Sequence, residues 1–434
     1  MLIWGMALSR IWAAFILVSI VVAGVRYAIV PADKEIFSAM VTGKAGDTVG
    51  GQVQKADGII GTCSSAVTLA IGLIGIMALF MGLVSIAEAA GGMRFLARIT
   101  GPFFSKLFPD VPPGHPALGH MVMNFSANLL GLDNAATPFA LKAMESLQEI
   151  NPDKTRASNP QIMFLCLHQS GLQLIPVSVI AILAANGAKD PTDVFIPIVI
   201  ATFLTTLASM SVVAIRQRIN LFQPVILAWI GSLSVLIAGL VVYLRTLNAD
   251  GVQSFSRAFS GGLILFIFFA IVGVALYRKV NIFDAFVQGA KGGFDTAVRI
   301  IPYLVGMLVA ISMLRTSGTF EAIIDGLRHL FQAAGADTRF VDGLPTALIK
   351  PLTSAGARGM LVDTMKTIGN NSFAAHLSAI LQGSSESTFY VAAVYFGAVA
   401  IRNTRYSIGA MLIADGVSIV SSIFLCYLFF GHLH

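Results

Sequence analysis

Apolar residues in this chain gather in long runs that are separated by shorter polar segments. A helix needs about 20 mostly apolar residues to cross a bilayer. Nine runs reach or approach this length: 2–25, 63–90, 161–185, 193–215, 222–247, 259–277, 297–315, 387–401 and 405–430. The pattern therefore predicts an all-α polytopic membrane protein with about nine transmembrane helices.

Two longer intervals, 91–160 and 316–386, do not resemble ordinary loops. Each contains an apolar stretch that Gly or Pro interrupts and that is too short to cross a bilayer, at 118–131 and at 344–357. Apolar stretches of this length are typical of re-entrant or broken helices, which enter the membrane and turn back. We expect one such region in each interval.

The two intervals occupy matching places in the chain. The spans that precede them begin with similar three-residue segments, at 65–67 and 296–298. Similar segments that contain Gln and Ser follow them, at 168–171 and 382–385. Such self-similarity indicates an internal repeat. Five crossings separate the second predicted span from the seventh, and an odd number places the two halves in opposite orientations. The sequence thus predicts an inverted repeat, as in many secondary transporters.

This repeat divides the chain into four regions. They are a first span with a polar loop at 1–62, a first half at 63–220, two connecting spans at 221–280 and a second half at 281–434.

Composition supports a membrane environment and narrows the function. The 434 residues are 56% hydrophobic and only 12% charged, whereas soluble domains are about 25% charged. Lipid must therefore cover much of the surface. The net charge of +6 is scattered over short loops, so we expect no nucleic-acid partner. Phosphate-binding loops, paired-Cys motifs and catalytic Ser motifs are absent from the sequence, so we expect neither an enzyme nor a bound cofactor.

Loop charges predict the orientation in the membrane. The loops that contain Lys154, Arg218 and Arg402 belong to a set that is richer in Lys and Arg than the set containing Lys34 and Lys189. Basic loops stay in the cytoplasm. We therefore expect a multi-pass protein of the bacterial inner membrane, with its amino terminus in the cytoplasm and its carboxyl terminus outside.

Polar side chains at membrane depth are costly unless they pair or line a cavity, so they are candidate functional residues. The first interval contains five: Asn124, Asn128, Asp133, Asn134 and Thr137. Asn124 and Asn128 share a helix face, and Asp133-Asn134 suits a helix cap after a break. Such an amide-rich break suits a neutral polar solute or an ion. The alternative is that the amides only satisfy the interrupted backbone.

The third predicted span contains His168, Gln169 and Gln173, followed by Pro176, which frees a backbone carbonyl one turn earlier. His168 could act as a ligand or proton relay, or it could be a hydrogen-bonded interior residue.

The eighth span begins with a carboxylate among hydroxyl groups, in the order Ser385, Glu386, Thr388 and Tyr390. This group could coordinate a cation or exchange a proton. The alternatives are a helix cap or an ion pair between Glu386 and Arg358.

Two more residues complete the candidate set. Asp415 lies in the apolar last span, where a carboxylate must face the bundle and find a donor. Ser354 lies in the broken region of the second half.

Several of these motifs resemble a known family. The segment 124–138, continuing through 141–144, resembles spore maturation protein A, and the segments 350–352, 386–390 and 394–397 resemble spore maturation protein B. The chain looks like a fusion of the two. This resemblance implies a nucleoside-recognition (Gate) domain and a membrane role that is not confined to sporulation. His168 stands where the family pattern has Asn, and Ser387 where it has Thr.

Together these features favour a transporter-like protein that binds a small polar solute near the bilayer midplane. Asn124, Asn128 and Asn134 would bind from one half, and Ser354, Glu386 and Thr388 from the other. A coupling ion is compatible with this scheme, and the Gly-rich spans are compatible with a homodimer. The alternatives are a non-transporting scaffold for envelope or spore maturation and a flippase for lipid-linked precursors.

Overall fold

The computed structural model describes most of the chain. Its described backbone comprises residues 2–30, 33–43, 48–49, 52–53, 58–129, 133–173, 175–247 and 249–433. Some side chains within these ranges, including those of Asp133 and Asn134, lie outside the described part.

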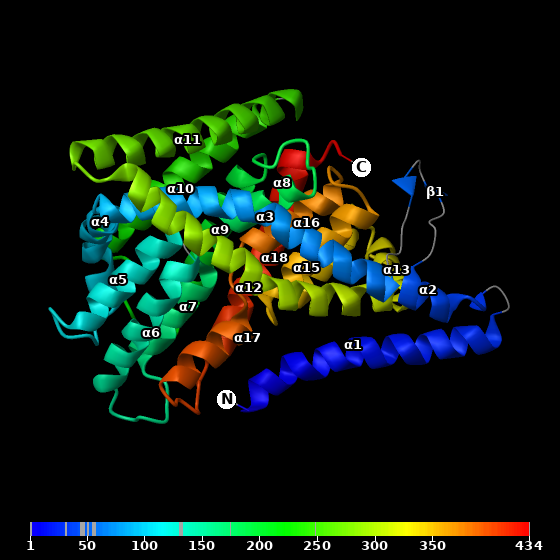
Figure 1. Cartoon of the computed structure of the whole chain (residues 1–434). Helices are drawn as coiled ribbons and strands as arrows, with labels where there is room; N and C mark the ends of the chain where they lie inside the picture. Colours follow the sequence, from blue (N-terminus) through cyan, green and yellow to red (C-terminus); the bar gives the residue numbers. More distant parts are fainter. Residues whose placement is uncertain are drawn as a thin grey trace.

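Helices account for nearly all of the regular structure (Figure 1). The long ones are α1 (Leu2–Ile29), α3 (Gly58–Ala89), α9 (Phe195–Gln217), α10 (Pro224–Arg245), α11 (Ala249–Tyr277), α12 (Ile282–Thr316) and α18 (Ser407–Phe430). The shorter ones are α2 (Ile36–Thr42), α4 (Gly92–Leu107), α5 (Pro116–Leu129), α6 (Asp133–Glu149), α7 (Asn159–Ser170), α8 (Val177–Ala185), α13 (Thr319–Ala333), α14 (Leu344–Ile349), α15 (Ser354–Thr367), α16 (Phe373–Gly383) and α17 (Thr388–Val391). A 3₁₀ turn (η2, Arg339–Gly343), a π-helical turn (η3, Ala392–Phe396) and a small antiparallel hairpin (β1, Thr48–Val49; β2, Gln52–Val53) complete the described elements.

The all-α polytopic membrane architecture predicted from the sequence is confirmed, with fewer continuous spans than expected. Within the described residues, five helices are long and apolar enough to cross a membrane. A sixth crossing is present if α12 and α13, which bend by 72° at their junction, form one span. The predicted span at 161–185 is not a continuous helix, because it breaks between α7 and α8. The predicted span at 387–401 corresponds to one short helical run, α17 continued by η3, which begins after the break that follows α16.

The order of elements repeats along the chain. A long helix (α3 or α12) is followed by a Gly with positive φ, Gly91 or Gly318, and by an amphipathic helix, α4 or α13. Interrupted helices come next (α5 to α8, or α14 to α17), and an unbroken span ends each half (α9 or α18). The internal repeat inferred from a few sequence similarities is therefore confirmed at the level of secondary structure.

Corresponding helices of the two halves run antiparallel. From Phe286 to Gly293 along α12, the closest neighbours on α3 move back from Gly82 to Ala78. Gln217, which ends α9, donates a hydrogen bond of 2.9 Å to the hydroxyl of Tyr406, which precedes α18. Two antiparallel pairs are what an inverted repeat requires.

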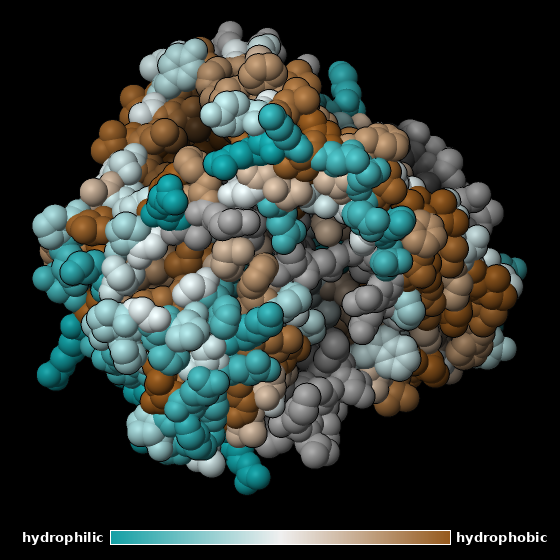
Figure 2. Space-filling view, turned by 60° about the vertical axis from the view of Figure 1, so that its left-hand side comes forward, coloured by the Kyte–Doolittle hydropathy of each residue, from teal (hydrophilic) through white to brown (hydrophobic). Residues whose placement is uncertain are grey.

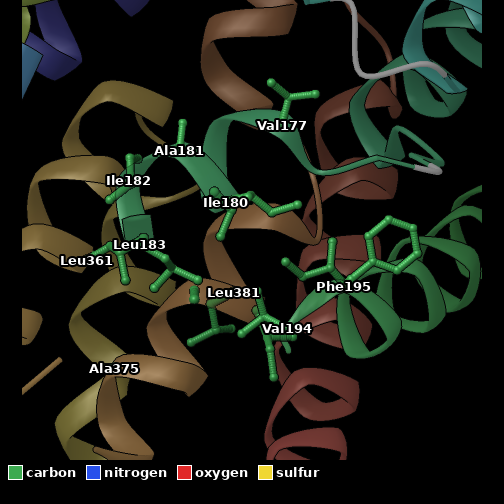
Figure 3. Close-up of a cluster of buried hydrophobic side chains, with 14 of the residues drawn as sticks. Val177, Ile180, Ala181, Ile182, Leu183, Val194, Phe195, Leu361, Ala375 and Leu381 are labelled. Carbon is green, nitrogen blue, oxygen red and sulfur yellow. The ribbon is translucent and has the colours of Figure 1, made fainter. Parts of the chain in front are cut away.

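Each interrupted span passes from its own half into the other. In Figure 1, α7 lies beside α5 and α6, whereas α17 from the second half lies at the same end of the molecule. The turn after α17 contributes Tyr395 and Phe396 to the apolar core of the first half. Conversely, Figure 3 shows α8 packed against the second half, with Ile182 and Leu183 near Leu361. The breaks mark the points at which the chain crosses between the two cores.

The outer helices expose apolar surface on a scale that suits lipid. Only 6% of the apolar stretch of α10 is buried, and 11% of that of α1. Figure 2 shows broad hydrophobic areas at the top and right of one face, with hydrophilic side chains gathered toward its lower left and centre. Exposed apolar patches of this extent are rare on soluble monomers, so these helices face the bilayer.

Candidate functional site

Local sequence explains the break after α7 and the start of α16. α7 begins with a capping box between Ser158 and Gln161 and ends at Gly171, whose φ of +34° lies in the left-handed region. Pro176 then prevents the helix from continuing directly into α8. In the second half, Ser372 caps α16 by accepting a hydrogen bond from the amide of Ala375 at 3.1 Å. Residues 384–387 then have no helical backbone.

Asp415 lies at the centre of the two breaks. Its side chain is buried, and its two oxygens accept three hydrogen bonds. Gln169 Nε2 donates to Oδ1 at 2.7 Å and Ser385 Oγ donates to the same oxygen at 3.1 Å, while Thr388 Oγ1 donates to Oδ2 at 2.6 Å. A carboxylate is acceptor-only, so three converging donors match its ionised form. Asp415 thereby ties the break of the first half to that of the second.

Glu386 makes the second link between the halves. Its amide donates to the backbone oxygen of Gln169 at 2.6 Å, and Gln169 Nε2 lies 3.2 Å from the backbone oxygen of Glu386. Its Oε2 accepts a hydrogen bond of 3.1 Å from Ser354 Oγ, which is also 2.8 Å from Ser387 Oγ.

A second polar network lies on the other side of α7. His168 Nδ1 is 3.1 Å from Asn124 Oδ1 and 3.2 Å from Asn128 Nδ2. One ring nitrogen cannot both donate to the first and accept from the second, so the tautomer of His168 decides which bond forms. Asn124 also donates to the backbone oxygen of Ala136 at 2.8 Å. Tyr395 places its ring edge-on to His168, with 4.8 Å between the centroids.

The structure therefore brings together most of the predicted site residues. His168 and Gln169 are neighbours on α7, so the Asn network and the Asp415 network are adjacent. Thr137, Gln173 and Arg358 are half-buried. Tyr390, by contrast, is 56% exposed and stands outside the buried cluster. The predicted break at Gly131 and the side chains of Asp133 and Asn134 lie outside the described residues.

Lys350 and Ser418 belong to the central cluster although sequence reasoning did not select them as site residues. Lys350 is 5% exposed, and its ammonium donates a hydrogen bond to the backbone oxygen of Gln382. Ser418 Oγ donates to Ser384 Oγ at 2.6 Å. The signal for Lys350 was present, because a lysine inside an apolar stretch marks a functional position by default.

The central cluster is closed. A cavity beside Asp415 leaves about 10 Å³ for the centre of a water-sized sphere, which is room for about one water. The predicted convergence of polar groups is thus present, but the pocket is not open in this conformation. Among the described residues, no group of three or more His, Cys, Asp or Glu side chains could hold a metal ion.

A larger cavity of about 430 Å³ lies at the bend between α12 and α13. Arg315 lines this cavity. Its guanidinium lies 2.5 Å from the Asp363 carboxylate on α15 and 4.2 Å from the centre of the Phe320 ring. Arg328 on α13 pairs with Asp342 at 2.7 Å across the same cavity. Sequence reasoning missed this cavity because its charged residues are spread over four separate elements.

Comparison with known proteins fits the repeated fold. A sequence-family model described as "Gate: Nucleoside recognition" matches residues 70–215 and 297–402. These two segments make up more than half of the chain, and each falls within one structural half. The chain belongs to the Gate nucleoside-recognition family. No solved structure matches it.

Two curated relatives of this Gate protein come from Bacillus subtilis (strain 168). Spore maturation protein A is 41% identical over 145 residues, which are 33% of this chain and 74% of that protein. Spore maturation protein B is 42% identical over 164 residues, which are 37% of this chain and 90% of that protein. The resemblance inferred from the motifs around Asn124 and Glu386 is therefore confirmed. This chain is a multi-pass membrane protein of the nucleoside-recognition family.

Proposed function

We propose that this protein is a transporter-like protein of the bacterial inner membrane that binds a small polar solute, nucleoside-like or ionic, between its two Gate halves. The observation that carries the proposal is the contact of Gln169, from the first half, with both Glu386 and Asp415 from the second. In inverted-repeat transporters, substrate sites lie near the midplane at the repeat interface, where discontinuous helices expose backbone groups. The breaks at Gly171–Pro176 and Ser384–Ser387 have this character.

Two sets of loop contacts close the site, one at each end of the molecule. At one end, the backbone oxygen of Thr155 accepts hydrogen bonds from the amides of Arg402 and Asn403, at 2.8 and 3.0 Å. At the other end, Asn371 Oδ1 accepts a hydrogen bond of 2.8 Å from the amide of Lys189. Each contact joins a loop of one half to a loop of the other. The two halves would part at one end at a time, which gives the solute access from alternating sides.

The orientation follows from the charge of these ends. The basic residues Lys154, Arg156, Arg402 and Arg405 accompany the first loop contact, so this end would lie in the cytoplasm. The far end of α1 contacts the opposite side of the molecule, where Arg26 donates to the backbone oxygen of Ser317 at 3.0 Å. Since α1 runs toward that side, the amino terminus would be cytoplasmic.

Flux through reconstituted vesicles tests the proposal. Purified protein is incorporated into liposomes, and the uptake of radiolabelled uridine, inosine and ⁸⁶Rb⁺ is measured against protein-free vesicles. We expect flux of at least one probe in the wild type and its loss in Asn128→Ala and Glu386→Gln. Glu145→Gln is the matched control, because Glu145 is exposed on α6 and the change is chemically identical. Absence of flux for all probes, or equal flux in wild type and both site variants, would contradict the proposal.

A further inference from the structure

Lys350 occupies a position that needs a charge partner. It follows the last residue of α14, in a stretch that is otherwise apolar, and only 5% of it is exposed. A charged side chain at this depth is strongly disfavoured unless a carboxylate or several oxygens surround it. Its ammonium donates a hydrogen bond to the backbone oxygen of Gln382.

The Asp415 carboxylate of the central site is the nearby group of opposite charge. Lys350 and Asp415 line the same small cavity, so the ammonium and the carboxylate attract each other across it. Ser384, Ser385 and Ser418 line this cavity as well. A buried cation and a buried anion therefore share a space that admits about one water molecule.

The oxygens of this cavity form a donor set that suits a hard monovalent cation. They comprise the Asp415 carboxylate and the three serine hydroxyls that line the cavity, and the Gln382 carbonyl adds one more oxygen at the ammonium itself. Hard cations prefer carboxylate, carbonyl and hydroxyl oxygens. The matching place in the first half has a different chemistry. There, Asn128 near the end of α5 lies 3.2 Å from His168 near the end of α7, without a lysine or an acidic side chain in that contact. Of these two matching places, only the one in the second half therefore combines a lysine with a carboxylate in the contacts described here.

We propose that the Lys350 ammonium is the resident cation of this oxygen-lined cavity, in the place that a sodium ion would otherwise take. The inference rests on the proposed function because it concerns the cation of the same central site. It implies that the wild-type protein binds its solute without a requirement for Na⁺. It also implies that removing the ammonium creates a Na⁺ site that the natural protein lacks.

Thermal unfolding of the purified full-length chain in detergent tests this directly. The midpoint is measured in NaCl and in N-methyl-D-glucamine chloride at equal ionic strength, so that general salt effects cancel. We expect no difference for the wild type. For Lys350→Ala we expect a saturable rise with Na⁺ of about 2 °C or more, because a ligand that binds only the folded state raises its midpoint.

Two matched variants separate a created ion site from general destabilisation. Lys350→Arg keeps the cation and should remain insensitive to Na⁺. The double variant Lys350→Ala/Asp415→Asn removes both charges and should lose the Na⁺ effect. Lys350→Gln, a milder change, should behave like Lys350→Ala.

Several results would overturn the inference. One is Na⁺-dependent stabilisation of the wild type, and another is a folded Lys350→Ala protein that melts identically in both salts. If neither Lys350→Ala nor Lys350→Gln folds even in Na⁺, sodium does not replace the ammonium, and the inference is also wrong. Folding of these variants only in Na⁺ would support it. These measurements require no flux, so a failure of transport would remove the proposed function without deciding this point.

Discussion

The hydrogen bond between Gln169 and Asp415 joins the two halves at the centre of the molecule, and its strength can be measured. Gln169→Met removes the donor while preserving most of the side-chain volume, and Asp415→Asn removes the charge of the acceptor. Both side chains are buried, and the two atoms are 2.7 Å apart. Hydrogen bonds to buried charged groups contribute about 1.5–3 kcal/mol. The double variant should therefore be more stable than additive behaviour predicts, by roughly that amount.

The assay is a double-mutant cycle of unfolding in mixed micelles with increasing sodium dodecyl sulfate, followed by far-ultraviolet circular dichroism. Gln161 provides a matched control on the same helix, because it is equally buried but bonds to Ser158 and Gln148 at the other end of α7. Gln161→Met combined with Asp415→Asn should be additive within about 0.5 kcal/mol. If Gln169→Met and Asp415→Asn were also additive within that limit, the link between the halves would carry no energy and the reasoning would be refuted.

Three further predictions address the repeat, the bend and the loop contact. Gly293→Val should cost about 3 kcal/mol or more, because its Cβ would meet the backbone of α3. Gly239→Val on α10 is the control, since a Cβ there has no atoms within 4 Å. Similar melting of both variants would exclude close packing of α3 and α12. Arg315→Gln should lower stability by about 1–3 kcal/mol, because the half-buried Asp363 carboxylate on α15 would lose the cation with which it pairs. Unchanged melting would show that this ion pair does not hold the bend between α12 and α13. Arg156 and Asn403 face each other in a parallel bridge, so cysteines at both positions (Arg156→Cys and Asn403→Cys) can form a disulfide. Oxidation of this pair should stop flux, and reduction should restore it. Flux that persists in the cross-linked protein would mean that this contact never opens.

The helical membrane architecture could be predicted because length and hydrophobicity alone decide whether a segment crosses a bilayer. The broken spans were harder to predict, since 161–185 contains Gly171 and Pro176 but is apolar over most of its length. Hydropathy responds to composition, whereas the break depends on backbone conformation. A continuous apolar run therefore looked like a continuous helix.

The central site was predictable in its members but not in its partners. A buried carboxylate such as Asp415 must find donors, and that requirement follows from the sequence. The identity of those donors, Gln169 in one half and Thr388 in the other, depends on the crossing of the two broken spans. Local sequence patterns contain no information about that crossing, and for the same reason they did not connect Lys350 with Asp415.

The central claim is that polar groups of both halves form one site that opens alternately to each side of the membrane. Ser385→Cys, in a background with the three native cysteines replaced by alanine, places a reactive thiol beside Asp415. Membrane-impermeant maleimide should label this thiol from either face of oriented vesicles. The Arg156–Asn403 cross-link should abolish labelling from the face that carries those loops and preserve it from the other. No labelling from either face, or labelling that ignores the cross-link, would contradict the account.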